Sequence, residues 1–100
     1  MASGGSTMIL RSTLEAHGDW VTSIAAPTHT EEGEPEDIFI SASRDRKAVV
    51  WRITGDAVEY ATPERSLEGH AHFVQDVCLS ADAKYALTAS WDGTLRLWDL

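Results

Sequence analysis

Histidine, serine, aspartate and tryptophan recur as a set at two places in this 100-residue chain. Histidine, serine and aspartate are the members of a hydrolase triad, in which the imidazole activates the serine hydroxyl. The same four residue types also build a hydrogen-bond network, in which the aspartate accepts from the imidazole and the serine bridges the imidazole to the indole N–H. The two sets are His17, Ser43, Asp45 and Trp51, and His70, Ser90, Asp92 and Trp98.

The duplication favours a structural network over a catalytic one. A hydrolase needs one nucleophile, whereas this set occurs twice with a tryptophan each time, and no nucleophile-elbow glycines surround Ser43 or Ser90. His70 and His72 are close enough in sequence to share a metal, but no further ligand follows at metal-site spacing. We therefore predict no catalytic residue, no metal and no cofactor. Truncating one network member is expected to cost about 1–3 kcal/mol, because its partners stay buried and unpaired.

The elements that position these residues are short strands, repeated once along the chain. LEAHGDWVTSIAA from Leu14 aligns with LEGHAHFVQDVCL from Leu67, and IFISASRDRKAVVWRI (38–53) aligns without a gap with YALTASWDGTLRLWDL (85–100). Both copies are rich in β-branched and aromatic residues between turn residues, which is typical of strands. The predicted strands are 20–26, 38–43 and 48–53 in the first copy, and 73–79, 85–90 and 95–99 in the second.

Further strands and packing follow from the same alignment. Residues 12–15 and 66–68 precede the two histidines and predict a fourth, outer strand in each case; a helix capping box at 12–15 is the competing signal. The third strands are apolar on both faces, which predicts strands sandwiched between neighbouring sheets. Cys78 aligns with Ala25 and is predicted to pack in the core.

The copies differ in length because of one acidic insertion, PTHTEEGEPED (27–37), with five carboxylates in its last seven residues. Clustered charge cannot be buried cheaply, so this segment is predicted to be a solvated loop extension. An acidic docking loop is the alternative.

Composition narrows the class of protein further. The net charge of −8 excludes coating of nucleic acid by bulk charge, so any such contact needs a local basic patch. The single cysteine excludes an internal disulfide. MASGGSTM is no signal peptide, and no apolar run is long enough to span a membrane. We expect a cytoplasmic protein with no membrane span and no small-molecule substrate.

The LEGH, FV, Ser-x-Asp and LRLWD phrases resemble the WD-repeat family, which folds as β-propellers with four-stranded blades. The resemblance implies an all-β fold: about two blades of an expected seven-bladed ring, a fragment that is poorly stable alone. Departures from the pattern are Ala16, Ala83 and the acidic insertion. The implied organisation is a flexible N-terminus (1–7), an outer strand closing the last blade (8–14), a first repeat (15–68), and a second repeat truncated before its last strand (69–100).

Within that family, the chain most resembles the Gβ-like scaffolds that bind the small ribosomal subunit and protein kinase C. This implies a non-enzymatic scaffold whose partners are small-subunit RNA and proteins, and, through the full-length ring, protein kinases and translation factors. A G-protein β-like subunit or a ubiquitin-ligase substrate receptor is the alternative.

One turn stands out by its charge. Arg44, Arg46 and Lys47 are three of the eight basic residues of the chain, and they surround Asp45. The resemblance places Arg44 and Arg46 where the family contacts ribosomal RNA, with Lys47 beside them. Forked guanidinium contacts to phosphate suit such a site. From the residues alone, a solvated turn with an Arg–Asp pair is the simpler interpretation.

Overall fold

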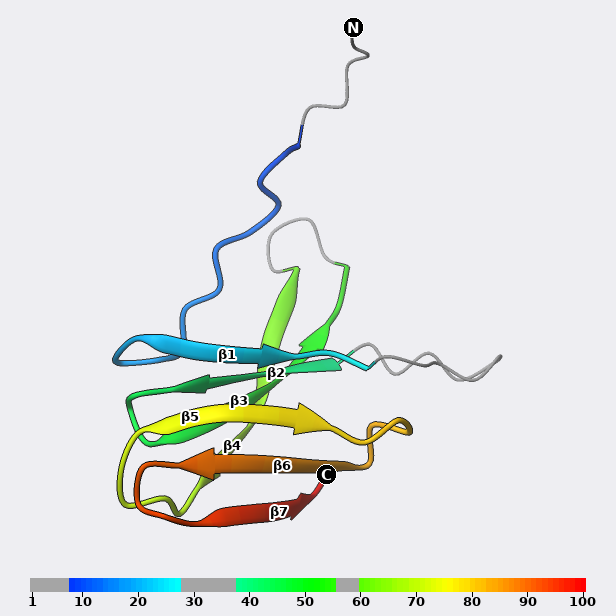
Figure 1. Ribbon diagram of the computed structural model, residues 1–100. Helices are drawn as coiled ribbons and strands as arrows, with labels where there is room; N and C mark the ends of the chain where they lie inside the picture. The colour runs from blue at the N-terminus through cyan, green and yellow to red at the C-terminus, as the bar shows by residue number, and fades with distance from the viewer. Residues whose placement is uncertain (1–7, 28–37, 56–59) are drawn as a thin grey trace, which may run out of the picture.

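The computed structural model describes residues 8–27, 38–55 and 60–100. They form two antiparallel sheets (Figure 1). The first has the order β1-β2-β3-β4 and the second the order β5-β6-β7, so strands that follow one another in the chain also pair. The bounds are β1 Val21–Ala25, β2 Ile38–Ser43, β3 Lys47–Ile53, β4 Ala61–Glu68, β5 Val74–Leu79, β6 Tyr85–Ser90 and β7 Leu95–Asp99.

The predicted all-β class and the six predicted inner strands are confirmed to within a residue or so at each end. The outer strand β4 is longer than the 66–68 predicted, because it pairs with β3 along its whole length. Pro63 is tolerated in β4, because this strand lies at the edge of its sheet and its register with β3 shifts beside Pro63, between Val50 and Trp51.

Three predictions cannot be checked in this structure. The flexible tail (1–7) and nearly all of the acidic insertion (28–37) lie outside the described residues. Residues 8–14 belong to none of the seven strands, and Met8, Ile9 and Leu10 are exposed. An outer strand needs a neighbour to pair with, and the predicted neighbour belongs to another blade, so this strand stays a prediction.

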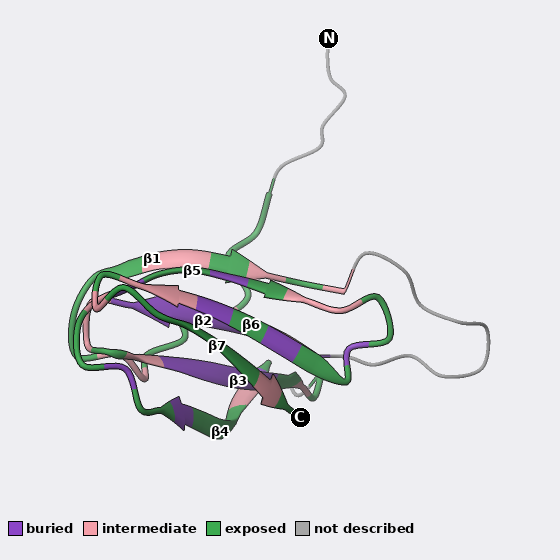
Figure 2. Ribbon diagram, turned by 60° about the horizontal axis from the view of Figure 1, so that its bottom comes forward, coloured by how far each residue is buried: buried purple, intermediate pink, exposed green. Residues whose placement is uncertain are grey.

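The core lies in the seam between the two sheets, where β5 packs against β1 and β2 (Figure 2). Alternate residues of each strand point into the seam, as the two-residue period of a strand requires. A smaller cluster on the outer face of the first sheet contains Val49, Trp51 and Ala61. The seam is lined by Ile38, Ile40, Ala42, Ala48, Val50 and Leu67 from the first sheet and by Val74, Val77, Ala83 and Ala86 from the second.

The two third strands differ in burial. Ala48 to Trp51 in β3 are all buried, as predicted, but Leu95 and Leu97 in β7 are 67% and 71% exposed. The prediction that β7 is covered on both faces is therefore wrong for this chain, because no third sheet lies on its far side in the described part of the chain. The core prediction for Cys78 is wrong for the same reason: its thiol is free and exposed on that far face, in register with Leu87.

Two backbone positions adopt positive φ without being glycine. Arg46 has φ 75° in the β2–β3 turn, where the second copy has Gly93 with φ 85°. Ala83 has φ 60° in the β5–β6 turn, at a position where the family pattern favours glycine. Left-handed backbone is unfavourable for residues with a Cβ, so both turns carry some strain.

Candidate functional site

The first polar network joins the loop before β1, strand β2, the β2–β3 turn and strand β3. The indole N–H of Trp51 in β3 donates to Ser41 Oγ in β2 at 2.8 Å, and Ser41 Oγ lies 2.6 Å from His17 Nε2. His17 Nδ1 lies 2.8 Å from the carboxylate of Asp45 in the β2–β3 turn. Because a carboxylate only accepts, we assign the proton of the neutral imidazole to Nδ1, so that Ser41 donates to Nε2 and every buried donor has an acceptor.

The second network repeats this arrangement with one substitution. Trp98 donates to Thr88 Oγ1 at 2.9 Å, and Thr88 Oγ1 lies 2.7 Å from His70 Nε2. His70 Nδ1 faces the carboxylate of Asp92 at 3.2 Å. Thr94 adds a hydroxyl to this carboxylate, whereas Lys47 stands at the matching position of the first repeat.

The structure thus brings together the predicted histidine, aspartate and tryptophan of each set, but the bridging hydroxyl is not the predicted one. Ser41 and Thr88 bridge, whereas Ser43 and Ser90 lie two residues further along the same face of the strand. The correction has a physical reason: two residues advance a strand by ~6.6 Å, which carries the hydroxyl past the indole to the turn.

Ser43 and Ser90 shape the turns instead. Each hydroxyl accepts from the backbone N–H of the aspartate two residues later, at 3.1 Å in both copies. Each also lies 3.3 Å from a carbonyl oxygen in the loop before the first strand of its repeat, that of Asp19 or His72. These bonds hold the loop that carries the histidine against the turn that carries the aspartate.

Ser41, His17 and Asp45 have the connectivity of a hydrolase triad, so the catalytic alternative needs a direct answer. Ser41 is 5% exposed, and its oxygen already accepts the Trp51 indole N–H. A substrate carbonyl cannot approach such an atom, which leaves a structural role. Within the described ranges, no group of three or more metal-ligating side chains is found.

Hydrogen bonds lower the pKa of both network aspartates. Burial of Asp45 works against its charged form, but hydrogen bonds from His17 and from the Gly18 and Lys47 amides outweigh this and lower its pKa. The Thr94 hydroxyl and the Ala71 amide hold the pKa of Asp92 well below its usual range. Both side chains are therefore carboxylates at neutral pH, and their lone pairs are occupied by the loop they hold.

The basic turn lies between β2 and β3, at the same end of the molecule as the β6–β7 turn (Figure 1). Arg46 is exposed, while Arg44 and Lys47 are half-buried. The Arg–Asp pair of the simpler interpretation is absent among residues 8–27, 38–55 and 60–100, because Asp45 is bound to His17, to the Gly18 amide and to the Lys47 amide. None of the three cations of this turn is thus held in an ion pair by the carboxylate between them.

Arg44 lies between two aromatic rings. Its guanidinium carbon is 4.2 Å from the centroid of Trp20, just before β1, and 4.6 Å from that of Phe73, just before β5. Both distances are within the range of a cation–π interaction. The rings belong to different repeats, and no spacing argument within one repeat would have found this contact.

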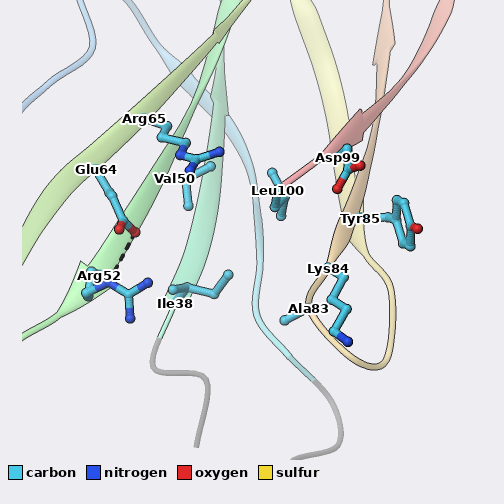
Figure 3. Close-up of a pocket in the computed structure, with 10 residues that line it drawn as sticks. All are labelled: Ile38, Val50, Arg52, Glu64, Arg65, Ala83, Lys84, Tyr85, Asp99 and Leu100. Carbon is cyan, nitrogen blue, oxygen red and sulfur yellow. Dashed lines mark hydrogen bonds and ion pairs between the residues drawn. The ribbon is translucent and has the colours of Figure 1, made fainter.

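The opposite end of the molecule has a cavity of about 400 Å³ between the two sheets (Figure 3). Its charged lining is mixed: Arg52 is paired with Glu64 at 3.1 Å, and Arg65, Lys84 and Asp99 complete it. No residue predicted for a site lines this cavity, and opposite charges on its wall do not select a ligand of one sign.

The repeated sheets and their His–hydroxyl–Trp–Asp networks are the signature of WD-repeat blades. A family model described as "WD domain, G-beta repeat" matches residues 8–52 and 61–99, so the chain belongs to the WD-repeat family. No helix with the length and apolar composition needed to cross a bilayer occurs in the described part of the chain.

Two curated relatives narrow the assignment within the WD-repeat family. The chain is 52% identical over 93 residues to the small ribosomal subunit protein RACK1 of Saccharomyces cerevisiae, and 50% identical over 95 residues to the protein of the same name from Candida albicans. Each match covers 93% of this chain and 28% of the relative. The predicted resemblance to a Gβ-like ribosomal scaffold is thereby confirmed, for a chain that spans just over a quarter of the length of these relatives.

Proposed function

We propose that this chain is part of a non-enzymatic WD-repeat scaffold that binds the small ribosomal subunit, and that Arg44, Arg46 and Lys47 contact ribosomal RNA. The name of the two relatives, which share half of its residues, supports the ribosomal partner. Recruitment of protein kinases and translation factors by the full-length ring, and a cytoplasmic location, belong to the same proposal.

The observation that carries the RNA contact is the state of Asp45. In a turn of three cations and one carboxylate, an internal ion pair would occupy the donors of one cation. Here the carboxylate is bound by the His17 imidazole and two backbone amides, so all three cations keep their donors for phosphate. Phosphate contacts supply most of the sequence-independent affinity for nucleic acid, and they make binding sensitive to salt.

The test is co-sedimentation of the full-length gene product with small ribosomal subunits across a salt series. Arg44→Asp combined with Arg46→Glu is expected to weaken binding and to flatten the logarithmic salt dependence by about 1 for each phosphate that the variant no longer neutralises. Circular dichroism is the check that the variant is folded.

The matched control reverses the same amount of charge at the other end of the molecule. Arg52→Asp with Lys84→Glu alters the cavity of Figure 3 and is expected to leave ribosome binding unchanged. Equal losses of affinity in both double variants would show that the loss comes from the change in net charge and not from the basic turn. A wild-type protein that never sediments with ribosomes would contradict the ribosomal proposal and leave an interaction subunit of another complex.

A further inference from the structure

The environment of Arg44 differs from that of its two basic neighbours. Arg46 and Lys47 have no aromatic ring over their charged groups in the described structure, whereas the guanidinium of Arg44 lies between Trp20 and Phe73. In the second repeat, Trp91 takes the place of Arg44 and stacks on His72 with ring centroids 5.6 Å apart. Only the first of these two turns therefore offers a cation in this position.

The two rings cover the guanidinium and leave its donors available. In the described part of the chain, the Arg44 side chain makes no hydrogen bond and no ion pair. A planar guanidinium stacked on aromatic rings keeps its N–H groups at the edge, in the fork geometry that matches two phosphate oxygens. Ordering a long side chain before binding removes part of the entropy cost of the contact.

We propose that Trp20 and Phe73 are positioning residues that hold Arg44 ready for a forked phosphate contact, so that two neighbouring blades build the RNA site together. This inference rests on the proposed function. Trp20 comes from the first repeat and Phe73 from the second, and the seam between the repeats fixes their spacing. Thr22 Oγ1 donates to the Val74 carbonyl at 2.6 Å, and Ser23 donates to Asp76 at 2.7 Å, both close to the two rings in sequence.

The experiment measures the affinity of the full-length gene product for small ribosomal subunits, together with its salt dependence. Phe73→Leu and Trp20→Leu remove one ring each and leave all charges in place. Each is expected to raise the Kd about three- to tenfold, the range of a partly desolvated cation–π contact, with the salt slope unchanged. Arg44→Lys is expected to weaken binding to a similar extent, because an ammonium keeps the charge but has no planar fork.

Two controls separate positioning from a purely structural role. Tyr85→Leu removes an exposed aromatic ring at the other end of the molecule, beside the cavity of Figure 3 and away from Arg44, and is expected to leave the Kd within about twofold. In an Arg44→Ala background, Phe73→Leu is expected to change the Kd no further, because its effect passes through Arg44. A lowered melting temperature with an unchanged Kd in Phe73→Leu and Trp20→Leu would overturn the proposal, as would an equal loss of affinity in Tyr85→Leu.

Failure of this inference is distinguishable from failure of the proposed function. If the wild-type protein does not bind ribosomes, both fall. A second outcome separates the two ideas: the wild-type protein and the two ring variants bind equally well, but the double variant Arg44→Asp with Arg46→Glu does not bind. In that case the RNA contact stands without the positioning role.

Discussion

The two repeats present the same cross-strand row of side chains to two different environments. In the first sheet the row runs across β1, β2 and β3 and faces the second sheet; in the second sheet the matching row runs across β5, β6 and β7 on the far face. The first row is Ala25, Ile40 and Val50, and the second is Cys78, Leu87 and Leu97. Ile40 and Val50 are 0% and 3% exposed, while Leu87 and Leu97 are 37% and 71% exposed.

The difference shows that burial in this architecture belongs to the stack of blades rather than to the strand. Each blade has an indole-bearing face and an apolar face, and the apolar face is buried only where the next blade covers it. Repeat proteins gain stability in this way, by adding an interface for each neighbour. The seam between the two sheets is the one such interface in the described structure.

The largest expected effect comes from placing a charge on each row. In the 100-residue chain, Val50→Asp is expected to cost ~2–4 kcal/mol, because a carboxylate enters the buried seam, and Arg65 on the paired strand offsets only part of its loss of hydration. Leu97→Asp is expected to stay within ~0.5 kcal/mol, because its side chain faces water. Urea unfolding monitored by tryptophan fluorescence measures both.

The same pair of variants in the full-length gene product sharpens the comparison. A third blade over β7 would raise the cost of Leu97→Asp toward that of Val50→Asp. An unchanged cost there would contradict the proposed ring, and equal costs in the short chain would contradict the exposure of β7.

A smaller effect distinguishes the bridging hydroxyls from the turn hydroxyls. Ser41→Ala leaves the Trp51 indole without an acceptor and His17 without its donor, and is expected to lower the free energy of unfolding by about 1–3 kcal/mol. Ser43 is itself fully buried, but its hydroxyl bonds to two backbone groups at the part-buried turn, the Asp45 amide and the Asp19 carbonyl, so for Ser43→Ala we expect ~1 kcal/mol. Thermal denaturation of the two variants ranks them, and a larger destabilisation in Ser43→Ala would restore Ser43 as the central serine.

The two β-turns provide a test of backbone strain. Arg46 adopts φ 75° at the position of Gly93, so Arg46→Gly is expected to stabilise the fold by up to ~1 kcal/mol, while Gly93→Ala is expected to destabilise it by ~1–2 kcal/mol. Under the proposed function, Arg46→Gly also reduces ribosome affinity, so that stability and binding change in opposite directions. Chemical denaturation and co-sedimentation of the same preparation measure the two quantities, and a parallel decrease in both would contradict this.

The smallest effects are expected in acid. Because hydrogen bonds lower the folded-state pKa of Asp45 and Asp92, each carboxylate stabilises the fold above its unfolded pKa of about 3.9, and this contribution is lost as the pH falls below that value. Stability should thus be level near neutral pH and decline below about pH 4. Asp92→Asn should remove more of this acid dependence than Asp45→Asn, because burial is the largest influence on the Asp45 pKa and opposes its shift, whereas at Asp92 the hydrogen bonds from Thr94 and Ala71 outweigh burial. Urea midpoints between about pH 3 and 7 test the order, and the reverse order would contradict it.

The amino-acid sequence by itself determined the strands, the repeat and the membership of the polar networks, except for the residue that supplies the bridging hydroxyl in each network. Alternation with a period of two tells which residues share a face, and Ser41 and Ser43 share one, so the pattern cannot say which hydroxyl reaches the indole. That choice depends on the rise of the strand and the placement of the tryptophan on its neighbour.

Tertiary structure alone decided which faces are covered. Cys78 and Ala25 align in sequence, yet only Ala25 packs against the seam, because coverage depends on the neighbouring blade and not on the residue. The position of Arg44 has the same origin: its rings come from two repeats, and only the docking of β5 against the first sheet brings Phe73 to Arg44. Local sequence encodes faces and turns, whereas contacts between repeats arise from packing over long separations in the chain.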